Sequence, residues 1–351
     1  MTRTHIITGS FGAGKTTAIR WLMAHKAPSE LWVVILNEFT DAGLDALSVA
    51  QSARGDYDVR LVAGGCLCCA GELEFGKQVR DILRHLKPAR LLIEPSGAAH
   101  AGAIADELAA YAAQGVLSLD GVICLLDPID AMRLAGSRAN GGDSARAAAE
   151  WAQIQSADVV LLSKPDLSNP AAQAAFDSIV LEQFPPKRLV GTCVNGAIPA
   201  DALQKFERAV NFSPLGAVPT GGAPPVSTPF VIAGLDGIET QWRALGLNAV
   251  SWIAPGELEF SRTVIEPRLQ WLTAAAQTSL CRLKAVFRTG PGPSWLIQSH
   301  GRGLAAEDSA YRRDSRLELV LDSAPTPEFL ESWRALLRDA ALPRTRGMRT
   351  P

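Results

Sequence analysis

The feature that most constrains the fold is a glycine-rich segment close to the N-terminus. Residues 9–16 read Gly-Ser-Phe-Gly-Ala-Gly-Lys-Thr and match the phosphate-loop pattern G-x-x-x-x-G-K-[ST] in full. A strand-like apolar run precedes the loop and an amphipathic helical pattern follows it, which is the context that such a loop needs. We therefore expect a nucleoside triphosphate and Mg²⁺ to bind here. Three glycines let the backbone curl around the phosphates: Gly9, Gly12 and Gly14.

The two residues that end this loop predict its chemistry. Lys15 is expected to reach the β- and γ-phosphates, and the hydroxyl of Thr16 is expected to bind Mg²⁺. A second Mg²⁺ group is a carboxylate at the end of another buried strand. Leu-Leu-Ile-Glu at residues 91–94 supplies it as Glu94, and the turn that follows can respond to the γ-phosphate. The alternative for Glu94 is a strand that ends at a surface glutamate.

A segment further along the chain concerns the base. Ser163-Lys164-Pro165-Asp166 follows an apolar run, and the usual GTPase form at such a place is Asn-Lys-x-Asp. The Asp166 carboxylate can accept the N1 and N2 hydrogens of guanine, which adenine does not offer. Ser163 departs from the usual asparagine and would tie the loop less firmly. We expect Ser163, Lys164 and Asp166 to contact the nucleotide and GTP to be preferred to ATP; a plain Pro-Asp turn is the alternative.

The cysteines are clustered. Three of the six lie within Gly-Gly-Cys-Leu-Cys-Cys at residues 64–69, as Cys66, Cys68 and Cys69. Without a secretory signal pattern, such a cluster is typical of a metal or redox site rather than of disulfides. Thiolates favour Zn²⁺, Cu⁺ and similar ions, and three of them leave one tetrahedral position open, which suits an ion that is passed on. Glu38, Asp41 and solvent are the candidates for the fourth ligand. Buried small residues and a redox pair are the alternatives.

The pattern of apolar runs predicts two domains. Short runs alternate with helical patterns over residues 1–210, which indicates an α/β domain with a mostly parallel sheet. Four prolines and three glycines in residues 211–228 predict a linker. Residues 229–342 predict a smaller α+β domain, and 343–351 a tail. Strands are expected at 5–8, 32–36, 90–94, 121–126, 159–162, 188–194, 230–233, 251–254, 282–287, 295–298 and 317–321, and helices at 15–25, 72–86, 262–276 and 327–340.

Charge and hydropathy bound the partners. The net charge is −2 and the pI is about 6.2, so nothing favours attraction to nucleic acid or to an anionic membrane. No apolar run approaches the roughly 20 residues of a membrane span. We therefore expect a cytoplasmic protein that binds neither nucleic acid nor a membrane. A homodimer is left open.

These segments together resemble a known family. The stretches at 9–17, 37–39 (Asn-Glu-Phe), 64–69, 93–97 (Ile-Glu-Pro-Ser-Gly) and 163–166 have the order and spacing of the CobW-like GTPases, which are relatives of the nickel-insertion GTPases of urease and hydrogenase. The Cys-x-Cys-Cys motif is the specific part of the resemblance. A weaker likeness covers Cys281–Phe287 and the segment from Arg316. The resemblance implies a P-loop NTPase domain followed by a small ferredoxin-like C-terminal domain.

The resemblance also implies a function. It suggests a GTP-dependent metallochaperone that delivers Zn²⁺, Co²⁺ or another transition metal to a client metalloprotein, with Zn²⁺ as the leading candidate. Lys15, Thr16 and Thr17 would contact the nucleotide and Mg²⁺, Glu94 would support Mg²⁺, and the three clustered cysteines would bind the transferred metal. Glu38 lies in the first switch-like segment and is a candidate to position the attacking water. The rival interpretations are a P-loop ATPase or kinase, a zinc-stabilised interaction module without turnover, and a thiol redox sensor.

Overall fold

A computed structural model of the chain divides into two compact units, Met1–Glu207 (unit 1) and Arg208–Pro351 (unit 2), and each is described by itself. The structure describes residues 1–38, 44–63, 72–95, 101–139, 145–204, 226–244, 247–275, 280–290, 292–300 and 303–343. Strand β8 begins at Val226, so the last three residues of the stretch expected as a linker belong to a strand. Among the described helices, none is long and apolar enough to cross a membrane.

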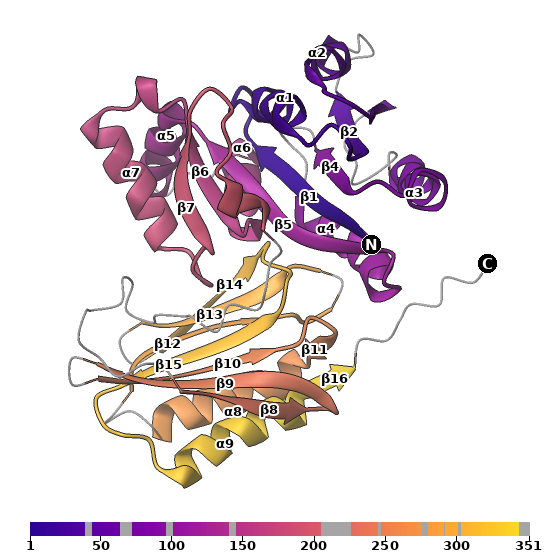
Figure 1. Ribbon diagram of the computed structural model, residues 1–351. Coiled ribbons are helices and arrows are strands. Elements are labelled where there is room, and N and C mark those ends of the chain that lie inside the picture. The colour runs from indigo at the N-terminus through magenta and orange to yellow at the C-terminus, as the bar shows by residue number, and fades with distance from the viewer. Residues whose placement is uncertain are drawn as a thin grey trace. The chain divides into compact units, whose positions relative to one another are not determined.

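Unit 1 is built on a parallel sheet of seven strands with helices on both faces (Figure 1), as the α/β pattern predicted. The strands in spatial order are β3 (Tyr57–Ala63), β2 (Trp32–Glu38), β4 (Arg90–Glu94), β1 (Thr2–Gly9), β5 (Leu117–Leu126), β6 (Val159–Ser163) and β7 (Leu189–Cys193). The helices are α1 (Lys15–His25), α2 (Leu44–Ser52), α3 (Glu72–Asp81), α4 (Ala101–Ala113), α5 (Pro128–Ala139), α6 (Ala145–Ser156) and α7 (Pro170–Leu181), with short helical turns at Ile82–Leu86, Pro165–Leu167 (η2) and Ala200–Leu203.

Continuous apolar runs give this sheet its two buried faces. Successive side chains of a strand point to opposite faces, so Ile6 joins the core under α3, α4 and α6, whereas Ile7 joins the core under α1 and α2. Leu92 and Ile93 of β4 divide in the same way. All of these side chains are fully buried. Parallel strands buried on both faces leave only their ends open to solvent, and ligands of such sheets bind beyond the carboxyl ends.

Unit 2 is an α+β unit with an antiparallel sheet and two helices, α8 (Arg262–Ala275) and α9 (Pro327–Ala340), along one face (Figure 1). Its apolar core includes Trp252, Leu319 and Trp333. The strands in spatial order are β14 (Gly303–Ser309), β13 (Ser294–His300), β12 (Leu280–Phe287), β15 (Ser315–Leu321), β10 (Leu247–Ala254), β9 (Leu235–Ala244) and β8 (Val226–Ile232), and β11 (Leu258–Phe260) pairs separately with β16 (Ala341–Pro343).

The central strands of unit 2 follow a ferredoxin-like path. β10 passes through α8 to β12, and β15 lies between these two strands and antiparallel to both, which makes a split β-α-β unit. Two hairpins widen the sheet: β13–β14 beyond β12, and β8–β9 beyond β10. The β8–β9 hairpin occupies the edge beside β10, and the last short strand pairs with β11 instead. The expected small α+β unit is therefore present, with a larger sheet.

Candidate functional site

The phosphate loop joins the end of β1 to the start of α1, and its glycines adopt conformations that other residues rarely reach. Gly9 has a φ of 141°, and a β-carbon there would lie 2.3 Å from the carbonyl oxygen of Leu125 on β5. Gly12 and Gly14 have φ values of 78° and 93°. Only glycine meets these demands without strain. The loop can therefore bend around the N-terminus of α1, where backbone N–H groups favour an anion.

Lys15 is held within this loop. Its side chain is buried, and Nζ donates hydrogen bonds to the carbonyl oxygens of Gly9 at 3.0 Å and Ser10 at 2.9 Å. The ring of Phe11 lies 5.9 Å from the same nitrogen, and Phe11 is otherwise exposed. A cation fixed across the mouth of a phosphate loop is the arrangement that neutralises charge on transferring phosphates.

Thr16, on the first turn of α1, faces Glu94 at the end of β4. The Thr16 hydroxyl donates to both carboxylate oxygens of Glu94, at 3.2 and 3.3 Å. Glu94 ends β4, which pairs with β1, and it is 9% exposed. Adjacent oxygens around an octahedral Mg²⁺ are about 2.9 Å apart, so a hydroxyl and a carboxylate at this separation fit that ion. The structure therefore brings the two predicted Mg²⁺ residues together.

The base segment follows β6, the second strand from β1 on the other side. Lys164 has a left-handed backbone with φ of 47°, and η2 then presents Asp166, whose side chain is exposed. The Lys164 Nζ lies 3.4 Å from Oδ2 of Asp127, which directly follows β5. The hydroxyl of Ser163 is buried, and the described residues offer it no hydrogen-bond partner. The three predicted residues thus lie in one loop, at the same carboxyl end of the sheet as the phosphate loop.

A further turn, after β7, reaches the start of α1. Gly196 has a φ of 84°, and a β-carbon there would lie 2.6 Å from the carbonyl oxygen of Thr17. Thr17 itself is exposed. Cys193 at the end of β7 is buried, and this burial raises the pKa of its thiol. Loops after β1, β4, β6 and β7 therefore share one edge of the sheet.

Two carboxylates that the sequence reasoning missed stand at this edge. Asp130 on the first turn of α5 accepts a hydrogen bond from the hydroxyl of Ser10 in the phosphate loop. Asp127 accepts from the backbone N–H of Asp130 at 2.9 Å and pairs with Lys164. An acidic residue between a buried strand and a proline that starts a helix was the available signal.

The cysteine segment lies outside the described residues, as does Asp41, and so does the side chain of Glu38. The backbone nevertheless shows where the segment begins. β3 ends at Ala63, which is paired in register with Glu38 at the end of β2, and α3 begins at Glu72. Among described residues there is no group of three His, Cys, Asp or Glu side chains placed to hold a metal.

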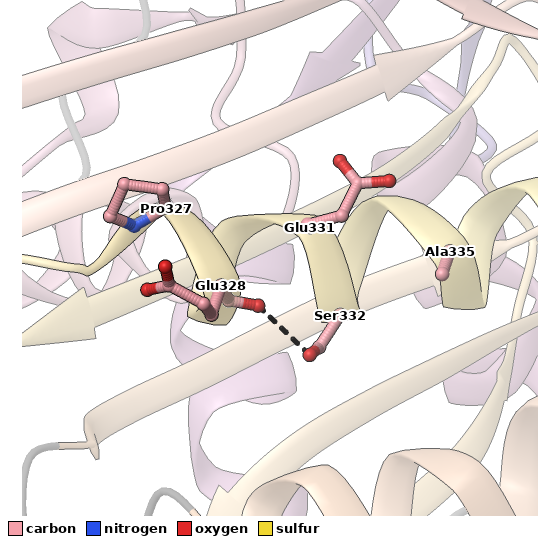
Figure 2. Close-up of a pocket in the computed structure, with 5 residues that line it drawn as sticks. All are labelled: Pro327, Glu328, Glu331, Ser332 and Ala335. Carbon is pink, nitrogen blue, oxygen red and sulfur yellow. Dashed lines mark hydrogen bonds between the residues drawn. The ribbon is translucent and has the colours of Figure 1, made fainter.

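Unit 2 carries a shallow hollow along α9 (Figure 2). All of its lining residues come from that one helix. Ser332 donates to the Glu328 carbonyl at 2.9 Å, and Glu331 pairs with Arg334 and Arg338. The hollow offers no convergent groups from other elements, so the edge of the unit 1 sheet is the candidate site.

The chain is similar to several known proteins. A family model described as the CobW/HypB/UreG nucleotide-binding domain matches residues 3–190. The zinc chaperone YeiR of Escherichia coli K12 is 30% identical over 96% of this chain and 98% of its own length. The zinc chaperone YjiA of the same strain is 30% identical over 47% of this chain and 50% of its own. The solved structure of Zn(II)-bound YjiA GTPase from E. coli covers 95% of this chain and 98% of its own, with 17% identity and a TM-score of 0.43.

Proposed function

Because the chain belongs to the CobW/HypB/UreG family and its first unit is that family's GTPase domain, we propose that it uses GTP to gate the transfer of a transition metal to a client protein. Zn²⁺ is the first candidate, since a relative that spans nearly the whole chain is named a zinc chaperone. The observation that carries the proposal is the meeting of the phosphate loop with Glu94 at the edge where the strand before the cysteines also ends.

The nucleotide half of the proposal rests on the loops after β1, β4 and β6. The triphosphate would lie against the phosphate loop, with Lys15 at the β- and γ-phosphates and Thr17 beside it. Thr16 and Glu94 would hold Mg²⁺, which neutralises charge on the phosphate oxygens when bound. The base would be read by the loop from Ser163 to Asp166, where an exposed carboxylate can accept the two guanine hydrogens.

The metal half rests on strand order. β3 stands next to β2, and β2 next to β4. Neighbouring strands are about 4.8 Å apart, so the end of β3 lies roughly 10 Å from the end of β4, with Glu38 between them. Cys66, Cys68 and Cys69 follow the end of β3 within six residues. Over so short a distance, a movement of the backbone at Glu94 or Glu38 on nucleotide binding would alter the arrangement of the thiolates.

In the proposed cycle, the state of the nucleotide controls the affinity for the metal. GTP and Mg²⁺ order segments 36–45 and 95–101 through the γ-phosphate, as in other nucleotide switches, and this brings the three thiolates together. Hydrolysis removes those contacts and loosens the metal near the client. Linkage then requires that metal tighten GTP binding by the factor by which GTP tightens metal binding. Glu38 remains a candidate to position the attacking water.

The test is a Zn²⁺ titration of the full chain, with and without a non-hydrolysable GTP analogue. We expect tighter Zn²⁺ binding with the analogue, and loss of that site in Cys68→Ala. Cys281→Ala is the matched control, because Cys281 is an exposed cysteine on β12 of unit 2. Equal Zn²⁺ affinity in the two nucleotide states would refute the proposed coupling.

Other outcomes would favour the rival interpretations. Tight Zn²⁺ binding that does not depend on nucleotide and that the protein needs in order to fold would favour the interaction module. Tighter binding of ATP than of GTP would favour the ATPase or kinase. Sedimentation of the GTP-bound chain tests the homodimer.

A further inference from the structure

The first turn of α5 connects the two loops that would hold opposite ends of the nucleotide. β5 lies between β1 and β6 in the sheet, and Asp127 follows it directly. On one side, Asp130 accepts the hydroxyl hydrogen of Ser10 in the phosphate loop. On the other side, Asp127 pairs at 3.4 Å with Lys164 of the loop from Ser163 to Asp166, which we call the base loop. The backbone N–H of Asp130 donates to Asp127 at 2.9 Å, so the two contacts share one turn.

The charges around this turn are balanced by the protein itself. Arg133 and Arg146 both donate to Oδ1 of Asp130, at 2.8 and 3.1 Å, and both also pair with Glu150. Burial raises the pKa of Asp130, but the hydrogen bonds from Ser10 and Arg133 outweigh it, and the pKa lies below its ordinary value. Asp130 is therefore an ionised acceptor. The neighbouring guanidinium groups offset a carboxylate that would otherwise repel a phosphate.

The geometry of the two loops makes such support necessary. Lys164 is held in the left-handed region, which a residue with a β-carbon adopts only when its surroundings fix it. The phosphate loop has three glycines with positive φ, which lose the most conformational freedom when ordered. The loop that contains Lys164 is therefore strained, and the phosphate loop loses much conformational entropy when it is ordered. A carboxylate on the first turn of α5, or directly before it, contacts each loop. A hydrogen bond to a charged group is among the stronger ties that a protein forms.

We propose that Asp127 and Asp130 are positioning residues of the GTPase site, in which Asp130 fixes the phosphate loop through Ser10 and Asp127 fixes the base loop through Lys164. Neither carboxylate needs to touch the nucleotide. The inference rests on the proposed binding of GTP at this edge. It assigns a separate half of the ligand to each carboxylate, and that division makes it testable.

The test uses two probes with a chain of three phosphates, of which only the first carries a nucleoside: a non-hydrolysable GTP analogue and inorganic tripolyphosphate, each with Mg²⁺. Ser10→Ala should weaken both probes about tenfold, the loss of one charged hydrogen bond. Asp130→Ala, which removes the acceptor, should do the same, and the double variant should be no weaker than either single one. Asp127→Asn should weaken the GTP analogue about tenfold but leave tripolyphosphate within about twofold.

Controls separate positioning from general damage. Ser10→Thr keeps the hydroxyl and should retain binding. Ser137→Ala removes a hydroxyl of α5 that donates to the carbonyl of Leu134 in the same helix, and it should change neither affinity. Thermal unfolding of each variant is measured alongside. Wild-type affinity in Ser10→Ala, or an equal loss of both probes in Asp127→Asn, would overturn the inference. If the wild-type chain fails to bind the GTP analogue at all, the proposed function fails instead.

Discussion

In unit 1 the buried carboxylate Glu94 lies where a parallel strand ends, whereas in unit 2 the buried carboxylate Glu239 lies within the sheet and is held by the helix packed against it. Glu94 ends β4 and accepts hydrogen bonds from the hydroxyl of Thr16. Glu239 lies within β9, where Arg334 of α9 donates to both of its oxygens at 2.7 Å and Trp252 donates at 2.7 Å. Both carboxylates are buried.

The different partners of these two carboxylates indicate different roles, structural for Glu239 and ligand-binding for Glu94. A carboxylate clamped by a bidentate arginine and an indole has its charge and lone pairs satisfied by the fold. A carboxylate at a loop edge that faces a hydroxyl at metal-ligand spacing is arranged for an ion that the chain does not itself supply. We therefore expect substitutions in unit 1 to change activity more than stability, and substitutions in unit 2 to do the reverse.

The largest expected effect is in the core of unit 2. Trp333 of α9 is completely buried against Phe329 and the sheet. Trp333→Ala should destabilise unit 2 by about 3–5 kcal/mol, through lost burial and the cavity that remains. Hydrogen exchange read by mass spectrometry would localise the loss to unit 2, and the affinity for a GTP analogue should not change. Ser332→Ala on the exposed face of the same helix is the control. Weakened nucleotide binding in Trp333→Ala would contradict a purely structural role for this core.

The second prediction concerns Lys15 of the phosphate loop, whose substitution should change activity and not stability. Lys15→Ala should lower kcat for GTP by about 100- to 1000-fold, because the cation that stabilises charge on the transferring phosphate is lost. Unfolding temperature should change little, since the lost hydrogen bonds are to loop carbonyls. Lys77→Ala, at an exposed lysine of α3, is the control for losing a positive charge. A variant that is active but unstable would reverse the role assigned to this lysine.

The sequence was most informative where contacts are local. The phosphate-loop pattern predicted a helix at 15–25, and α1 spans Lys15–His25. The helix expected at 327–340 is α9. Strand β3 was missed because Asp58 and Arg60 alternate with its apolar residues, as suits an edge strand whose polar side chains pair with each other. The cluster of three cysteines predicts a metal site by chemistry alone, and its test is the Zn²⁺ titration.

The positioning carboxylates escaped sequence reasoning for a different reason. Ser10 and Asp130 are 120 residues apart, and Lys164 and Asp127 are 37 apart. Neither pair has a spacing that recurs along one helix or strand. They meet only because β1, β5 and β6 are neighbours in the sheet. Strand order was not predicted, so neither pairing could be predicted from the sequence, whereas the prediction for Glu94 needed only its place at the end of a strand.

A smaller effect is expected in unit 1, at the carboxylate of Asp166. Asp166 is exposed on η2, so Asp166→Asn should leave stability unchanged. It should weaken a GTP analogue by about 10- to 100-fold, because an amide cannot accept both guanine hydrogens. The ATP analogue should bind as before. Asp177→Asn on α7, another exposed aspartate, is the control. Equal loss for both analogues would mean that this loop does not read the base.

The smallest expected effect concerns a buried carboxyl of unit 2 and its dependence on pH. Glu318 of β15 is 1% exposed and contacts Arg282. Burial raises its pKa from 4.5 to about 7, against the opposing pull of Arg282. Between these two values the folded chain keeps a proton that the unfolded chain releases, so stability should fall as pH rises and level off above pH 7.

The measurement is the free energy of unfolding of unit 2 between pH 4.5 and pH 8. The wild-type loss should be about 1–2 kcal/mol, since relaxation around a buried charge removes part of the full effect. Glu318→Gln keeps the neutral form at every pH and should flatten this slope. Glu239→Gln should instead lower stability throughout, because Arg334 loses its ionised partner and the pKa of Glu239 lies below its ordinary value. If the slope persists in Glu318→Gln, another group titrates, and the contrast between the two carboxyls of this sheet fails.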